Sequence, residues 1–357
     1  MRVLYFFLMI FSLAFPAALS AASPGYLASA VSGDRYGFID ERGEWAIQPQ
    51  FFGVMNFTAD GMAPAGGDVR WRFKWGFINT KGEWVIQPKF DGIARRSHDV
   101  EPFAADAPAA ALSGGKWGFI DAGGEWVIQP KFDAVLFFAV NGLAGAKSGS
   151  KWGFINLKGE WAIPPEFEGV DICFSANGLI AAAREKGRKL GYINSKGEWA
   201  IPPQFHFGGP FAANGLAPVS IGRGKFGFID SKGEWAIPPK FEALGGFAAN
   251  GLAPARSGGK VGFVDVRGEW AIRPVFDEVA GFAANGLAPA RSGAKAGFVD
   301  VHGEWVIQPK FDWVGGFTPN GLSQAGDGGK MGFIDARGEW VIQPKFDRVG
   351  EFTRTGQ

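Results

Sequence analysis

The stretch LAPARSGGKVGFVDVRGEWAIRPVFDEVAGF, residues 252–282, contains the pattern that decides the fold. Its apolar segments are short and are separated by glycine-containing turns, which is typical of β-hairpins. Pro274 is expected to end the third extended segment, because proline lacks the N–H that a sheet ladder needs. Since every connection is short, neighbouring segments should pair antiparallel. The predicted extended segments are 252–255, 261–265, 269–272 and 276–282.

The same unit recurs nine times along the chain. Its marker is Gly-Glu-Trp, which returns at intervals of 35 to 42 residues. No apolar period of 3.6 residues appears after the first 22 residues, so the sequence predicts an all-β array of tandem antiparallel meanders over residues 27–352. The nine marker tryptophans are Trp45, Trp84, Trp126, Trp161, Trp199, Trp235, Trp270, Trp305 and Trp340.

An Asp or Asn opens the middle hairpin of every unit, and a Gly follows three residues later. In the quoted unit these residues are Asp265 and Gly268. Asp and Asn share the ability to accept a backbone hydrogen bond, but they do not share a charge. We therefore expect them to cap the turn instead of ligating a metal. The Gly supplies the left-handed conformation that a three-residue hairpin needs.

Three units contain Lys-Trp-Gly-Phe-Ile, at residues 74–78, 116–120 and 151–155, each followed by Gly-Glu-Trp and Pro-x-Phe. On these residues the chain resembles the WG-repeat family of bacterial β-repeat proteins. The resemblance implies a repeat array that is commonly exported or envelope-associated and has no family-wide catalytic residues. The Trp before Gly varies in the other units, which indicates a packing position. Its replacements are Tyr36, Leu190, Phe226, Val261, Ala296 and Met331.

The ends of the array leave two architectures open. Residues 27–31 have the place of a first strand and residues 346–352 that of a last strand, so the array starts and stops in phase. In a closed, propeller-like ring, residues 27–31 would pair with the last unit. Nine blades exceed the usual range of about four to eight, and an open solenoid has no closure condition. We therefore expect an open curved solenoid, with the closed ring as the alternative.

The N-terminus indicates export. Residues 1–22 have the features of a cleavable signal peptide: Arg2, an apolar run from Val3 to Ala14, and small residues before position 23. The repeat domain would then be residues 23–357, located in the periplasm or outside the cell. Cys173 is the only cysteine, so no intrachain disulfide can form. The net charge of +1 provides no basic excess for nucleic acid, and no later apolar run is long enough for a transmembrane helix.

The marker tryptophans have two interpretations. An exposed ladder of indoles would stack on sugar rings. However, Trp and Ile alternate in these segments, as in Trp126 and Ile128, so both side chains should face an apolar interior. We expect all nine tryptophans to belong to the structural core of the repeats.

Departures from the repeat identify candidate partner contacts. Residues 67–74 and 184–189 alter the same loop in units two and five, and residues 95–101 interrupt a closing strand. The arginines of the first two segments could form one basic edge that binds a partner, and the alternative is drift in solvated loops. The candidates are Arg70, Trp71, Arg72, Arg95, Arg96, His98, Arg184 and Arg188.

The sequence contains no motif for catalysis or cofactor binding. The histidines do not recur in the repeat, and there is no HExxH or phosphate-binding loop. We therefore expect no catalytic residues, metal or cofactor. The predicted function is an exported, non-catalytic scaffold that binds a protein or an envelope polymer. The alternative is binding of cell-wall glycans through exposed aromatic residues.

Overall fold

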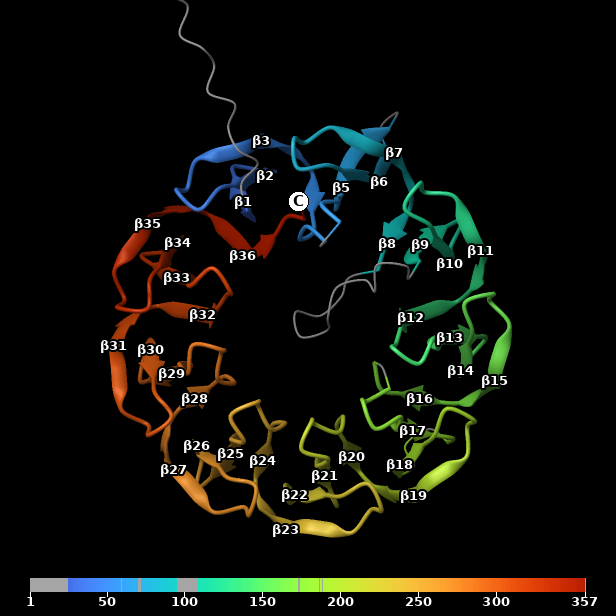
Figure 1. The fold of residues 1–357 in the computed structure, drawn as a ribbon, viewed down its shortest axis with the longest axis vertical. Coiled ribbons are helices and arrows are strands. Elements are labelled where there is room, and N and C mark those ends of the chain that lie inside the picture. The colour runs from blue at the N-terminus through green and yellow to red at the C-terminus, as the bar shows by residue number, and fades with distance from the viewer. Residues whose placement is uncertain are drawn as a thin grey trace, which may run out of the picture.

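The computed structural model describes residues 25–58, 60–69, 72–94, 108–172, 174–185, 187 and 189–356. These residues form 36 strands, grouped into nine four-stranded antiparallel sheets. The sheets are blades arranged around a central axis (Figure 1). The described part of the chain is therefore all-β, as predicted. The predicted signal peptide lies outside the described residues.

Each blade has four strands in the order inner, second, third and outer. The inner strands are β36 (Arg348–Arg354) in blade 1, then β4 (Gly53–Val54), β8 (Gly92–Ile93), β12 (Ala134–Phe138), β16 (Gly169–Val170), β20 (Phe207–Gly208), β24 (Ala243–Leu244), β28 (Glu278–Val279) and β32 (Trp313–Phe317). The second strands are β1 (Tyr26–Ser32), β5 (Ala63–Val69), β9 (Ala109–Ser113), β13 (Ala144–Ser148), β17 (Ile180–Ala183), β21 (Ala217–Ser220), β25 (Ala253–Ser257), β29 (Ala288–Ser292) and β33 (Ser323–Asp327). The third strands are β2 (Arg35–Ile39), β6 (Arg72–Ile78), β10 (Lys116–Ile120), β14 (Lys151–Ile155), β18 (Leu190–Ile193), β22 (Phe226–Ile229), β26 (Lys260–Val264), β30 (Lys295–Val299) and β34 (Lys330–Ile334). The outer strands are β3 (Trp45–Phe51), β7 (Trp84–Phe90), β11 (Trp126–Phe132), β15 (Trp161–Phe167), β19 (Trp199–Phe205), β23 (Trp235–Phe241), β27 (Trp270–Phe276), β31 (Trp305–Phe311) and β35 (Trp340–Phe346).

The array closes into a ring, so the expectation of an open solenoid was wrong. The last strand, β36, pairs antiparallel with β1 and becomes the inner strand of blade 1, with Ala28 opposite Phe352. Figure 1 shows the first and last blades side by side. Closure gives the free edge of β1 a hydrogen-bonding partner. Most inner strands are only two residues long, which leaves room at the axis for nine lean blades.

One contact geometry is repeated at all nine blade junctions, and this repetition explains the closure. The marker Trp of each blade meets, edge to face, the Phe that ends the preceding outer strand, with ring centroids 5.3 to 6.1 Å apart. The pair across the closure, Trp45 and Phe346, has a separation of 5.5 Å and is like the others. A constant rotation per blade therefore brings the ninth blade to the first.

A second junction contact requires glycine. The hairpin Gly of each blade lies against an Ile of the preceding blade: a methyl group on Gly303 would lie 2.5 Å from Cγ2 of Ile272. Across the closure, the same relation joins Gly43 to Ile342, at 2.7 Å. These glycines also have positive φ, 83° at Gly303, which side chains disfavour. The glycine of the repeat therefore serves both the turn and the packing of blades.

The middle hairpins have the predicted chemistry. In the quoted unit, Oδ1 of Asp265 accepts hydrogen bonds from the backbone N–H groups of Arg267 and Glu269, at 2.9 and 3.0 Å. In each of the other eight blades, the equivalent Asp or Asn accepts the same pair of hydrogen bonds. The turn-capping role is confirmed. The expectation that Pro274 ends its strand was wrong, because β27 continues to Phe276 on the outer edge of the sheet, where Pro is tolerated.

The hydrophobic core lies between the blades. Phe263 of the third strand is fully buried and packs on Phe282, which follows the inner strand of the next blade, with centroids 4.7 Å apart. Small residues of the second strands, such as Ala288 and Ala290, let neighbouring sheets approach closely. Each cluster of buried residues joins two blades, so each blade depends on its neighbours.

Candidate interaction surface

The hairpins between second and third strands form one edge of the ring, here called the hairpin edge. At most junctions a repeated ion pair lies along this edge. In blade 7, Lys260 Nζ lies 2.5 Å from Oδ1 of Asp277, and Oδ2 of Asp277 accepts the backbone N–H of Gly293 in blade 8 at 2.8 Å. The acid therefore connects two blades. Equivalent Lys–acid pairs are Lys74–Asp91, Lys116–Asp133, Lys151–Glu168, Lys295–Asp312 and Lys330–Asp347.

These pairs have a clear electrostatic signature. The hydrogen bond from Lys260 is the main reason that the pKa of Asp277 lies below its usual value, and the N–H of Gly293 acts in the same direction. The pKa values of Asp91, Asp133, Asp312 and Asp347 are lowered for the same main reason. The pairs are substantially exposed, so each contributes little to the free energy of unfolding.

The junction between blades 1 and 2 departs from this arrangement. Arg35 takes the place of the Lys, and Phe52 takes the place of the acid. The guanidinium of Arg35 lies 3.6 Å from the centroid of the Phe52 ring, so a cation–π contact takes the place of the Lys–acid pair between blades. Nε of Arg35 also lies 3.6 Å from Oδ1 of the adjacent Asp34. The Phe52 ring also contacts Phe73 at 6.4 Å, and Phe73 contacts Trp75 at 5.3 Å, both edge to face.

We call Arg35, Phe52, Phe73 and Trp75 the aromatic edge patch. Phe52 and Phe73 are 42% and 47% exposed, which is unusual for large apolar rings. The rings rest on glycine: a methyl group on Gly66 would lie 2.4 Å from the Phe73 ring. The strands β5 and β6 are seven residues long here, and this lengthened hairpin carries Phe73. A rigid, exposed group of aromatic rings with a cation is typical of a binding surface.

The structure separates the two segments that were expected to form one basic edge. Arg72 begins β6 in blade 2, whereas Arg184 follows β17 in blade 5, and blades 3 and 4 lie between them (Figure 1). Arg184 is also held within the chain, because its Nη2 lies 2.8 Å from Oε1 of Glu166. The other candidates, Arg70, Trp71, Arg95, Arg96, His98 and Arg188, lie outside the described residues.

Seven marker tryptophans are half-buried and pack against the core clusters, whereas Trp161 and Trp235 are exposed, so the prediction of nine core positions is correct only in part. The Ile two residues later is buried in every outer strand, as is Ile272. Each Trp begins an outer strand at the circumference, so one side packs on the preceding Phe and the other faces solvent. Trp161 and Trp235 are the most open, with exposed fractions of 37% and 39%. The alternation correctly predicted that Trp and Ile lie on one face of the strand. At the start of the strand, where the Trp lies, that face is partly open to solvent.

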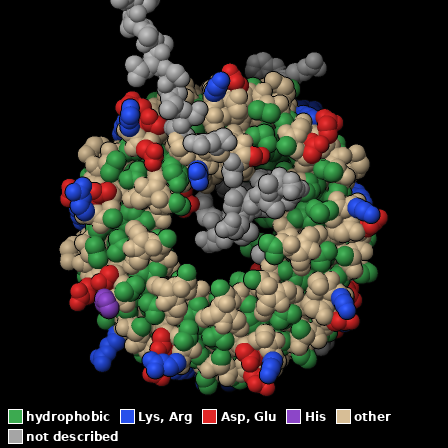
Figure 2. Space-filling model, viewed as in Figure 1, with side chains coloured by type: hydrophobic (Ala, Val, Ile, Leu, Met, Phe, Trp, Pro, Cys, Tyr) green, Lys and Arg blue, Asp and Glu red, His purple; other side chains and the backbone are tan. Residues whose placement is uncertain are grey.

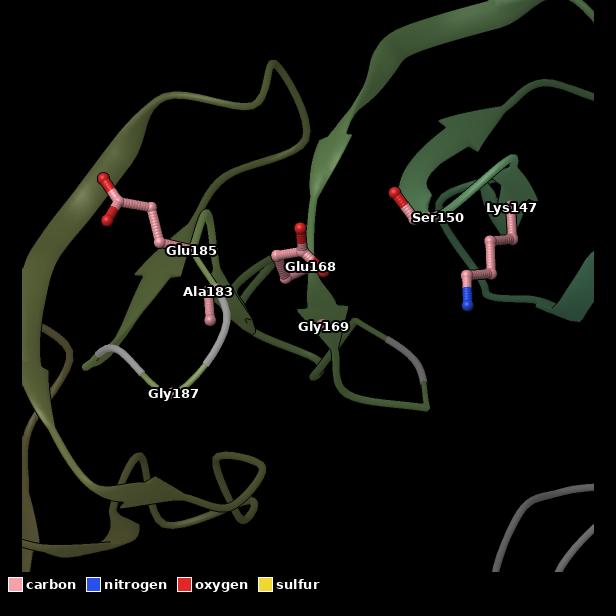
Figure 3. Close-up of a pocket in the computed structure, with 7 residues that line it drawn as sticks. All are labelled: Lys147, Ser150, Glu168, Gly169, Ala183, Glu185 and Gly187. Atoms are coloured by element: carbon pink, nitrogen blue, oxygen red, sulfur yellow. The ribbon is translucent and has the colours of Figure 1, made fainter.

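A shallow depression lies at the hairpin edge between blades 4 and 5, with a volume of about 450 Å³. Figure 3 shows Glu168 in the middle, Lys147 and Ser150 on one side, and Glu185 pointing away. Glu168 is paired with Lys151 at 2.8 Å. The depression therefore combines separated charges of both signs and does not bring two carboxyl groups together for acid–base chemistry.

Charged side chains are concentrated along the outer circumference in the view of Figure 2, while hydrophobic and uncharged groups surround the central opening. Within the described ranges, His, Cys, Asp and Glu form no cluster of three that could hold a metal ion. The same ranges include no helix with the length and apolar character needed to cross a membrane.

Sequence reasoning missed Phe52, although the signal was present. The residue after Pro-x-Phe is acidic in seven of the nine units, and unit one has Phe52 instead. Aligning the units by this position, together with Arg35 in the Lys position, would have identified the coupled change. What the sequence alone could not show is that Phe73, on the third strand of the next blade, packs against that ring.

Comparison with known proteins supports the fold. A model of the WG-containing repeat matches residues 36–65, 75–97, 117–152, 152–188, 191–225, 226–260, 262–295, 297–330 and 331–354. Among solved structures, the chain is similar to a eukaryotic initiation factor, with a TM-score of 0.62 at 10% identity over 92% of this chain and 97% of that chain. This likeness concerns the fold alone and agrees with the closed β-propeller ring.

Two other solved structures are more distant. Sqt1 of Saccharomyces cerevisiae gives a TM-score of 0.43 at 12% identity over 78% of this chain and 91% of that chain. A streptogramin B lyase gives 0.38 at 14% identity over 75% and 95%. No curated protein matches the chain.

Proposed function

The chain belongs to the WG-containing repeat family, and from its closed ring and aromatic edge patch we propose that it is a non-catalytic scaffold that binds another protein. The observation that supports this most is the replacement of a repeated ion pair by Arg35, Phe52 and Phe73 at one junction. Exposed aromatic rings and arginine are the residues that dominate protein interfaces. A partner with an apolar side chain beside a carboxylate would complement both the rings and the guanidinium.

The rigidity of the patch favours binding. The rings contact each other, lie on glycine and are carried by hydrogen-bonded strands, with Gly66 opposite Trp75 and Asp68 opposite Phe73 in the register. Little side-chain freedom is therefore lost when a partner docks, and this lowers the entropic cost of association. The proposed place of action is the periplasm or the space outside the cell, on the basis of residues 1–22. Intact-mass measurement of exported protein tests this location, since removal of those residues is expected.

The test of the scaffold function uses affinity capture from envelope extracts followed by binding measurements with the purified partner. The variant Phe52→Asp/Phe73→Ser should weaken that binding by at least about tenfold, because aromatic hot spots contribute about 2 kcal/mol or more. The matched control is Phe207→Ser in blade 6, which removes another exposed Phe, 45% exposed, far from the patch. Equal affinity for the double variant and the parent would refute the role of the patch.

The half-buried tryptophans favour a second candidate, binding of envelope glycans. Trp161 and Trp235 expose part of their indole on outer strands that also carry Pro164-Pro165 and Pro238-Pro239. Indole faces stack on sugar rings, and the repeated spacing would suit a polymer. Co-sedimentation with purified cell-wall polysaccharide tests this candidate. Trp161→Ala/Trp235→Ala should abolish co-sedimentation if glycan is bound there, whereas the Phe52→Asp/Phe73→Ser variant should leave it unchanged.

A further inference from the structure

A cross-strand row of three residues lies on the same side of every blade. We call it the inner row: the first residue of the inner strand, its partner on the second strand, and the residue before Gly on the third strand. In blade 2 the row is Gly53, Gly66 and Trp75. In blade 7 it is Ala243, Arg256 and Val261. The row faces the inner strand of the following blade, as shown by the packing of Trp75 in the cluster that contains Ile93.

In most blades an aromatic ring fills this row, and the other positions adjust to it. The indoles of Trp75 and Trp117 lie over Gly53 and Gly92, which leave space for them. In blade 9 the ring is on the inner strand instead: Trp313 accompanies Met331, with Gly326 between them in the row. The rows that contain a ring are those of blades 1, 2, 3, 4, 6 and 9, with Tyr36, Trp75, Trp117, Trp152, Phe207 with Phe226, and Trp313.

Blade 7 has no ring in its inner row, and an open depression of about 180 Å³, here called the blade 7 cavity, is found there. Ala243 and Val261 are both small, and no other residue of the row supplies a ring to fill the space beside them. The walls come from two blades. Leu244, Pro254 and Val261 of blade 7 and Val279 of blade 8 are apolar, and Arg256 adds a polar part. Blades 5 and 8 also lack a ring. In blade 5 the row is Gly169, Ala183 and Leu190, which includes no cation, and its first two residues line the depression that also contains charged side chains. In blade 8, Arg291 and Glu278 form an ion pair across the row, with Nε and Oε2 3.3 Å apart.

The cavity keeps the cation that accompanies a ring elsewhere. In blade 4, Lys147 occupies the middle of the row, and its Nζ lies 5.9 Å from the centroid of Trp152. In blade 1, the guanidinium of Arg348 lies 5.5 Å from the centroid of Tyr36. Arg256 has the same row position as Lys147 and lines the cavity, with Nη1 donating to the carbonyl of Gly259 at 3.0 Å. Cations favour the faces of electron-rich rings, and the indole is the best of these.

We infer that the cavity between blades 7 and 8 is a binding site for one indole ring supplied from outside the chain. The ring would take the place that Trp75, Trp117 and Trp152 occupy in their own blades, against Val261 and Val279 and next to Arg256. The volume suits a single side chain or a small aromatic molecule and not a larger ligand. The ring can come from a tryptophan side chain of a peptide or from a free indole. The site does not depend on the aromatic edge patch, so either can fail without the other.

The experiment titrates 5-fluoroindole and observes it by ¹⁹F NMR, because the chain's own tryptophans obscure fluorescence. One saturable site is expected. Val261→Trp should abolish binding, since the chain's own indole then fills the cavity, and should keep or raise the melting temperature. The matched control, Val266→Trp, places an indole on an exposed turn of the same blade and should bind like the parent. Absence of saturable binding to the parent, or full binding to Val261→Trp, overturns the inference.

Two further variants sharpen the result. Arg256→Gln should weaken binding by about two- to fivefold, the range of an exposed cation–π contact. Trp152→Val should open a second cavity and raise the stoichiometry from one to two. If Trp152→Val does not fold, the comparison of Val261→Trp with Val266→Trp decides alone. Titration of an unstructured peptide with one Trp, beside the same peptide with Ala, identifies the source: tighter binding of the Trp peptide than of 5-fluoroindole indicates a peptide ligand.

Discussion

The junction between blades 1 and 2 and the junction between blades 7 and 8 share their packing and differ at the hairpin edge. The ring contacts are the same: Phe51 meets Trp84 at 5.5 Å, and Phe276 meets Trp305 at 5.4 Å. The glycine contacts are also the same, with a methyl on Gly82 reaching Ile47 at 2.7 Å. At the edge, however, the first junction presents exposed aromatic rings and the second presents the Lys260–Asp277 pair.

This difference shows how the repeat divides its tasks. The Trp, Phe, Gly and Ile that join blades recur at every junction. The rotations between blades must add up to one full turn, so an altered angle at one junction would prevent the ring from closing. Positions at the hairpin edge carry little packing, so a single junction can change its chemistry without a cost to the fold. The aromatic edge patch is one such local change. The unfilled inner row of blade 7 is a local change of another kind, at a position that faces the next blade.

The largest expected effect tests the shared packing. Gly82→Ala and Gly303→Ala should each reduce the free energy of unfolding by about 2–4 kcal/mol, because the added methyl collides with an Ile and the residue must keep a positive φ. Gly286→Ala is the control: its φ is 81°, but no atom lies within 4 Å of the added methyl. Chemical denaturation measures all three. Equal losses for Gly286→Ala and Gly303→Ala would show that the contact with Ile272 is unimportant.

A smaller effect is expected from the tryptophans. Trp84→Ala and Trp305→Ala should each cost about 2–3 kcal/mol, less than a fully buried Trp, because each indole is only partly buried. The two losses should agree within about 0.5 kcal/mol, since the Trp–Phe geometry is the same at both junctions. Hydrogen exchange would locate the damage, which we expect in the two blades that share the junction. A loss spread evenly over the ring would contradict nearest-neighbour packing.

Exchange of the edge chemistry should change stability still less. Arg35→Lys/Phe52→Asp converts the first junction to the usual ion pair, and the free energy of unfolding should change by about 1 kcal/mol or less because the groups are exposed. Binding to a protein partner should be lost all the same. The reverse variant, Lys260→Arg/Asp277→Phe, serves as the control for stability. A large loss of stability in the first variant would mean that Phe52 is a structural residue.

The smallest effect is the acid sensitivity of the ion-paired junction. Because the pKa of Asp277 lies below its usual 3.8 in the folded chain, its ionised form adds stability above about pH 4. That contribution disappears as the pH falls through the folded pKa. The parent should therefore exceed Asp277→Asn in melting temperature at pH 6, and the two should converge once the pH falls below the lowered pKa of Asp277. The same comparison for Phe52→Ser, which removes no charge, should give a difference that does not depend on pH over this range.

The sequence determined the local structure of this protein. The alternation of short apolar segments with glycine turns specified four strands per unit, and the interchange of Asp265 with Asn in other units identified a turn cap, as the hydrogen bonds to Arg267 and Glu269 show. These features depend on residues close together in the chain. The recurrence of Gly-Glu-Trp likewise specified the number of units, because each occurrence marks the same hairpin.

Only the tertiary structure decided closure, burial and the candidate sites. Whether β36 meets β1 depends on a small rotation summed over nine junctions, and no single residue encodes that sum. The marker tryptophans look like core residues by alternation, but their exposure depends on where the outer strand meets solvent. Arg72 and Arg184 lie apart and Phe52 and Phe73 lie in contact because of where their blades stand around the ring. The sequence of a single unit does not specify that position.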